Sequence, residues 1–173
     1  MQQNSSTIDA YLALLKQLDT FQKRVLARYG KAIACRRGCS SCCILETVFP
    51  IEAWYVEHAL GKLSNTALQA LARQIKKARS GECVLLVRNQ CLIYKQRPII
   101  CRTHGLPLII EGKIDFCDKN FKGVSSLDGQ SILDLEKTTM VLAAINLRFL
   151  KEKKSATQTS GRVALREIVD KFI

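Results

Sequence analysis

The feature that most constrains this chain is a cluster of four cysteines within nine residues. Cys35, Cys39, Cys42 and Cys43 follow one another closely, and Gly38 lies among them with neighbouring serines. A backbone of this composition can turn tightly, so several sulfur atoms can converge. Thiolates are soft ligands that favour zinc, copper(I) or iron-sulfur centres over magnesium and calcium. The cluster therefore predicts a metal site.

A second group of cysteines, formed by Cys83, Cys91 and Cys101, completes the predicted site. It is separated from the cluster by residues 44–82, whose helical pattern would carry the chain out and back. Adjacent cysteines point in different directions in most backbone conformations, so we expect one of Cys42 and Cys43 to bind the ion while the other supports it or binds a second ion. The predicted ligands are Cys39, Cys42, Cys91 and Cys101, followed by Cys35, Cys43 and Cys83.

The presence of eight cysteines favours metal binding or redox chemistry over structural disulfides, because we expect the chain to be cytoplasmic, where thiols stay reduced. Residues 1–30 contain no uninterrupted apolar stretch of the kind found in secretion signals. No segment is apolar over the length that spans a bilayer. A chain of 173 residues that is 47% hydrophobic can also bury a core without crosslinks.

The hydrophobic pattern predicts a mainly α fold, a small helical domain with cysteine-rich loops and a minor β-hairpin. We expect one domain over residues 1–173, with its motif core at residues 34–105. Apolar residues recur every three or four positions, as on one face of a helix. Helices are predicted over residues 7–29, 50–60, 66–79, 131–150 and 163–172.

The ends of three of these helices carry recognisable signals. Gly30 and Gly61 can end the first two helices, and Pro50 suits the first turn of the second. Thr66 and Gln69 have the spacing of a capping box for the third helix.

Short strands are predicted in the middle of the chain. Residues 44–50 form a brief extended segment, and residues 83–87 and 91–94 resemble strands. Residues 107–110 and 113–116 form a hairpin around a two-residue Glu111-Gly112 turn. The polar segment 151–161 is predicted to be a mobile loop.

Basic residues flank the second cysteine group. Arg97 and Arg102 are predicted cofactor-binding residues, because they can offset the negative charge of thiolates and donate hydrogen bonds to them. The alternative is that both form ordinary surface ion pairs with carboxylates. The sequence leaves open whether His104 or Cys117 is a ligand, and it assigns no catalytic residue.

The order of the cysteine motifs along the chain resembles that of a known family. CRRGCSSCC, an Ile-Glu-Ala segment and CVLLVRNQCLIYKQRPIICRTHG resemble the YkgJ-like cysteine cluster family, whose domain is described as zinc- or iron-chelating. Val84 stands where the family has proline, and Leu92 where it has a small polar residue. The matching positions are Cys39, Cys42, Cys43, Cys83, Cys91, Tyr94, Arg97, Pro98, Cys101 and Arg102, with Cys35 in the variable first position.

This resemblance implies metal chelation by zinc or iron, including an iron-sulfur cluster. Iron would indicate a redox or electron-transfer role, and zinc a structural role. One alternative is a zinc-stabilised interaction module that binds RNA or an acidic protein through its basic surface, since the formal net charge is +12. Another is a cluster-dependent group-transfer enzyme, because the related flagellin lysine N-methylase joins such a cluster to methyl transfer. The chain lacks a Gly-rich loop between strand and helix that would bind a nucleotide-like cofactor.

Overall fold

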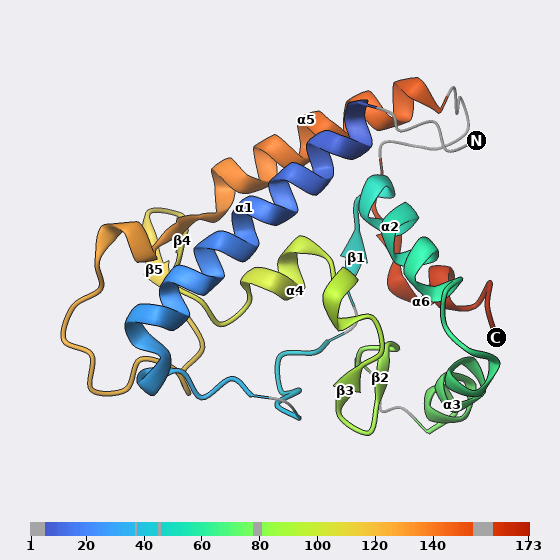
Figure 1. Cartoon of the computed structure of the whole chain (residues 1–173), viewed down its shortest axis with the longest axis horizontal. Coiled ribbons are helices and arrows are strands. Elements are labelled where there is room, and N and C mark those ends of the chain that lie inside the picture. The colour runs from blue at the N-terminus through green and yellow to red at the C-terminus, as the bar shows by residue number, and fades with distance from the viewer. Residues whose placement is uncertain (1–5, 37, 45, 78–80, 154–160) are drawn as a thin grey trace. The chain divides into compact units, whose positions relative to one another are not determined.

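The computed structural model describes residues 6–36, 38–44, 46–77, 81–153 and 161–173. Within these residues the chain forms six α-helices and several sheets of two or three short strands (Figure 1). The predicted mainly α fold is confirmed. None of the helices in the described ranges has the length and apolar character needed to cross a membrane. Of the predicted mobile loop, residues 154–160 lie outside the described residues.

The chain divides into two compact units. The first unit comprises residues 1–36 and 99–149, and the second comprises residues 37–98 and 150–173. The single domain that the sequence suggests stays a prediction, and each unit is described by itself.

Helix α1 (Ser6–Tyr29) is the longest element of the first unit. Its apolar residues recur at helical spacing and are buried, among them Tyr11, Leu18 and Val25. The helix ends where predicted, because the chain tightens into the 3-10 turn η1 (Gly30–Ala32). Most of helix α5 (Leu135–Glu152) belongs to this unit and runs alongside α1, where Arg148 Nη2 donates to Ser6 Oγ at 3.4 Å (Figure 1).

A three-stranded sheet accompanies these helices. Strands β4 (Leu108–Ile110) and β5 (Lys113–Asp115) are antiparallel, which confirms the predicted hairpin. Glu111 and Gly112 both have positive φ, the backbone conformation of a type I′ turn. Strand β6 (Leu133–Asp134) pairs with β4 in parallel. This pairing and the 3-10 turn η3 (Gly129–Ser131) explain why α5 begins later than predicted.

The second unit is built around helices α2 (Pro50–Leu60) and α3 (Asn65–Ile75). Helix α2 has the predicted bounds, and Glu52 Oε2 accepts a hydrogen bond from Phe49 N at 3.0 Å. The predicted cap of α3 is wrong by two residues. Ser64 is the N-cap, and its hydroxyl accepts from Ala67 N, so Thr66 lies inside the helix. A serine at this position satisfies an N–H of the first turn equally well.

Short strands join the remaining parts of the second unit. Strand β1 (Thr47–Val48) pairs with β7 (Val163–Ala164), which takes the first two residues of the helix predicted at 163–172 and leaves α6 (Leu165–Val169). Strands β2 (Leu86–Val87) and β3 (Gln90–Cys91) form a hairpin. The predicted strand at 91–94 is therefore shorter, because the 3-10 turn η2 (Tyr94–Gln96) follows.

The second unit has its own hydrophobic core. Side chains of α2, α3, α6 and the β2–β3 hairpin meet in it, and Val56, Leu71 and Ile168 are fully buried. Cys83 lies in this core, and Cys43 and Cys91 pack against it. Three of the predicted ligands are therefore positioned by the folded interior of one unit.

Candidate metal centre

The second unit brings together two cysteines that are far apart in the sequence. Cys83 N donates a hydrogen bond to Cys43 O at 3.1 Å. The next residues outward, Ile44 and Glu82, form an antiparallel bridge. The end of the first cysteine cluster therefore lies against the start of the second group, and residues between them form the excursion that carries α2 and α3.

Cys91 reaches the same region through the β2–β3 hairpin. It pairs with Leu86 across the hairpin, and Leu92 N donates to Leu85 O at 3.1 Å. The turn between the strands has positive φ at Arg88 and Asn89. Two successive residues with positive φ reverse the chain within two positions, so Cys91 returns close to Cys83.

The pKa values show that these thiols interact. Burial, together with charge repulsion from the nearby sulfurs of Cys42, Cys83 and Cys91, raises the pKa of the Cys43 thiol to about 12. Burial also raises the pKa of Cys83 to about 11, although a backbone N–H from Leu85 partly opposes the change. Cys43 and Cys83 are therefore protonated at neutral pH when no cation is bound. We call Cys43, Cys83 and Cys91 the thiol trio.

The pKa of the Cys91 thiol is raised for the same reason. Burial raises it, while a backbone hydrogen bond from Ile93 and the positive charge of Arg97 lower it. The guanidinium of Arg97 stacks on the ring of Tyr94, 3.9 Å from the ring centroid. A cation held over an aromatic face in this way is fixed in position. Arg97 thus supplies positive charge to one thiol. Its role as a cofactor-binding residue stays a prediction.

The rest of the first cysteine cluster forms a tight turn. Cys43 N donates to Ser40 O, and Ile44 N donates to Cys42 O at 3.1 Å. Gly38 has a φ of 90°, which only glycine adopts readily. The half-buried Cys39 has its sulfur 3.9 Å from Ser41 Oγ. Cys42 is hydrogen-bonded to the Cys43 side chain, so it lies beside the trio.

Two of the predicted ligands belong to the first unit. Cys101 lies half-buried on helix α4 (Ile99–Thr103). Cys35 is exposed and follows η1, and its sulfur accepts a hydrogen bond from Asn120 Nδ2 at 3.4 Å. The participation of these two cysteines in the metal site stays a prediction.

Asn120 is the residue of the site region that sequence reasoning missed. It is 2% exposed, its Oδ1 accepts from Ala34 N at 2.9 Å, and its Nδ2 also donates to Gly105 O at 2.7 Å. No motif or spacing in the sequence marks it. A buried asparagine with this many contacts is recognisable only once the chain has brought its partners together.

Arg102 has a different partner from the one suggested by its position beside Cys101. Its Nη1 donates to Asp19 Oδ1 of α1 at 2.5 Å, and the arginine is buried while the aspartate is half-exposed. The partner is a carboxylate, as in the alternative that the sequence left open, but the arginine is buried and does not form an ordinary surface pair. Its role as a cofactor-binding residue stays a prediction. His104 is exposed, and its backbone N–H donates to Ile100 O.

A zinc or iron site needs several donor side chains around one point. Among the described residues, no three His, Cys, Asp or Glu side chains are already arranged around one point. The chemistry nevertheless fits, because thiols from three segments lie close enough to raise one another's pKa. Soft thiolates in proximity are the ligands that zinc and iron take in cysteine-rich sites.

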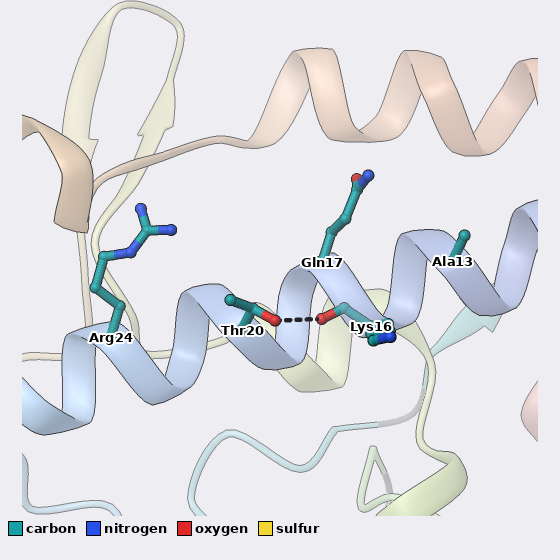
Figure 2. Close-up of a pocket in the computed structure, with 5 residues that line it drawn as sticks. All are labelled: Ala13, Lys16, Gln17, Thr20 and Arg24. Carbon is teal, nitrogen blue, oxygen red and sulfur yellow. Dashed lines mark hydrogen bonds between the residues drawn. The ribbon is translucent and has the colours of Figure 1, made fainter.

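Surface hollows of the first unit do not involve these sulfurs. Figure 2 shows one on the face of α1, where the hydroxyl of Thr20 donates to the Lys16 carbonyl at 2.9 Å. It is lined by Ala13, Lys16, Gln17, Thr20 and Arg24. A second hollow lies at the end of the same helix, and neither hollow is lined by a cysteine.

Comparison with known families decides the relationship. Residues 34–120 match the family model named CxxCxxCC, described as "Putative zinc- or iron-chelating domain". The chain belongs to this family, the YkgJ-like cysteine cluster family. The match covers both cysteine groups and extends to Cys117 and Asn120, beyond the segment 34–105 that carries the resemblance in the sequence. Membership supports metal binding by the chain. No curated protein and no solved structure matches the chain.

Proposed function

We propose that the chain chelates a zinc or iron ion in its second unit, through the thiol trio with Cys42 or Cys39 as a further thiolate. The observation that carries this proposal is the mutual effect of the sulfurs, since Cys42, Cys83 and Cys91 all raise the pKa of Cys43. Several thiols within range of one another are an unfavourable place for negative charge. A bound cation instead stabilises the negatively charged thiolates.

Metal binding would exchange protons for the ion. Each thiol that becomes a ligand releases its proton, so the affinity of the site is expected to rise with pH. Because Cys83 belongs to the hydrophobic core and Cys43 packs against it, the ion would also fasten the first cysteine cluster to the core of the unit. The binding free energy then contributes to folding.

The identity of the ion sets the role. Zinc with four thiolates has no redox chemistry and would serve the structure of the unit. Iron held by cysteines would support the redox or electron-transfer role that we propose for the chain, either as a single ion or as an iron-sulfur cluster. Both forms need reduced cysteines, which are maintained in a reducing compartment such as the cytoplasm.

The test is metal analysis of the full chain purified without oxygen. We expect stoichiometric zinc or iron, with a coloured protein and visible absorption only if iron is bound. Cys83→Ser and Cys91→Ser should lose most of the metal, whereas Cys117→Ser, in the first unit, should retain it. Full metal content in Cys43→Ser, Cys83→Ser and Cys91→Ser would contradict the proposal. Parallel Cys35→Ser and Cys101→Ser variants show whether the first unit contributes ligands.

A further inference from the structure

Gly105 brings two cysteines of the first unit to the same point. A β-carbon built on Gly105 would lie 3.5 Å from Cys35 Sγ and 3.3 Å from Cys117 Cβ. The φ of Gly105 is +83°, a conformation that residues with a side chain rarely adopt. Because Gly105 has no side chain, a space remains at this point. Both cysteines lie beside it, although they are far apart in the sequence.

Asn120 holds the Cys35 sulfur at this place. The two hydrogens of its amide nitrogen are directed to Gly105 O at 2.7 Å and to Cys35 Sγ at 3.4 Å. Ala34 N donates to the amide oxygen, so the asparagine is fixed from both ends.

The two cysteines differ in access to solvent. Cys35 is exposed, whereas Cys117 is half-buried and its thiol donates to Asp118 Oδ1 at 3.5 Å. Neither is in a disulfide. An exposed sulfur beside a second, more protected thiol is the arrangement of a reactive cysteine with a resolving cysteine.

We propose that Cys35 and Cys117 are joined in a reversible disulfide when a peroxide oxidises Cys35. The Cys35 sulfur attacks one oxygen of the peroxide, the O–O bond breaks, and the released hydroxide takes the proton of the Cys35 thiol and leaves as water. Cys35 is thereby oxidised to a sulfenic acid. The Cys117 sulfur then attacks the Cys35 sulfur, its proton passes to Asp118 and onward to the leaving hydroxide, and a second water departs. Two thiols and one hydrogen peroxide thus give one disulfide and two waters, and an external dithiol reverses the reaction.

This site is separate in its chemistry from the thiol trio. The proposal assigns Cys35 to a redox pair of the first unit, so the pair can be oxidised without removing a ligand from the trio. The disulfide would close a long loop, from the end of η1 to the residues before Asn120, and a crosslink over a long loop stabilises a fold by restricting the unfolded chain. Oxidation should therefore raise the melting temperature.

The experiment uses the full chain, loaded with zinc and freed of excess reductant, and treated with hydrogen peroxide at increasing molar ratios. Intact mass spectrometry should show a loss of about 2 Da, which is the loss of two hydrogens on disulfide formation. Digestion without reduction should give a linked pair of peptides carrying Cys35 and Cys117. Dithiothreitol should restore the original mass.

Variants give the controls. Cys117→Ser should stop at the sulfenic acid of Cys35, which dimedone traps, and Cys101→Ser should still form the disulfide. In Asp118→Asn the sulfenic acid of Cys35 should stay reactive toward dimedone several-fold longer than in the original chain. A dominant link from Cys35 to any cysteine other than Cys117, or unchanged disulfide formation in Cys117→Ser, would overturn the proposal. Metal content measured in the same samples distinguishes this outcome from failure of the proposed metal site.

Discussion

The backbone N–H of Ala34 donates to the side-chain oxygen of Asn120 at 2.9 Å, and these two residues are the first and last of the family match. The segment that defines the family is therefore closed by a direct hydrogen bond between its ends. Within the first unit, the same asparagine reaches the sulfur of Cys35. Asn120 thus links the closure of the segment to the position of one of its cysteines.

Replacing Asn120 with alanine should be strongly destabilising. The change removes three hydrogen bonds and leaves the buried Gly105 O without this partner. We expect the free energy of unfolding to fall by about 2 to 3 kcal/mol. Urea unfolding of the reduced chain measures the loss. Lys122→Ala, at a nearby exposed position, should change the value by less than about 0.5 kcal/mol. Equal effects of the two variants would contradict the role of Asn120.

A pair of glycine variants separates backbone strain from crowding. Gly105 and Gly112 both have positive φ, but a β-carbon on Gly112 would meet nothing within 4 Å. Gly112→Ala should lower the free energy of unfolding by about 1 kcal/mol, because alanine is strained in a left-handed backbone conformation. Gly105→Ala should cost clearly more, because its methyl group would lie 3.3 Å from Asn120 Nδ2. Similar losses in urea unfolding would show that the space at Gly105 is not needed.

The stability of the metal-free chain should depend on Cys43 at high pH. Its pKa is raised from 9.0 to about 12 in the folded state, so the folded chain holds this proton more tightly than the unfolded chain. The contribution of the thiol is complete below pH 9 and is lost as the pH rises from about 9 to about 12. The stability difference between the original chain and Cys43→Ala should be constant up to pH 9 and should shift against the original chain above it. Urea unfolding under reductant at several pH values measures this, and a difference that stays constant to pH 10.5 would contradict it.

Asp19 should matter for folding and not for metal binding. Its carboxylate pairs with the buried Arg102, so Asp19→Asn leaves a buried cation with a weaker partner. We expect a loss of about 1 kcal/mol, smaller than for a fully buried pair because Asp19 is half-exposed. Asp9→Asn, at an exposed position in the first turn of α1, is the matched control. It should lower the free energy of unfolding by about a few tenths of a kcal/mol at most. A loss of metal in Asp19→Asn would instead connect Arg102 with the metal site.

Local signals in the sequence were sufficient for much of the fold. Pro50 and Gly61 bound α2 as predicted, because proline favours the first turn and glycine a helix end. The Glu111-Gly112 turn gave the β4–β5 hairpin for a similar local reason. The cap of α3 was missed because Ser64 and Thr66 are both good caps, and only the folded chain shows which hydroxyl meets the free N–H.

Pairings between distant segments could not be predicted in this way. The antiparallel pairing of β1 with β7 and the parallel pairing of β6 with β4 depend on tertiary packing, and neither has a turn signal. The candidate site was likewise predictable only in part. Cysteine spacing indicated chelation, but the contact between Cys43 and Cys83 and the role of Asn120 arise from backbone and amide hydrogen bonds that spacing does not encode.

Helix α6 has a consequence for how the chain acquires its metal during synthesis. Leu165, Ile168 and Val169 are fully buried in the core that contains Cys83. A ribosome produces Cys43, Cys83 and Cys91 well before these residues, so the nascent chain presents its thiols to the cell with an incomplete interior around them. Their pKa values are then closer to those of free cysteine, so each thiol releases its proton to an incoming ion more easily than in the finished protein. Competition among cellular metals is thus expected to begin before the polypeptide is released.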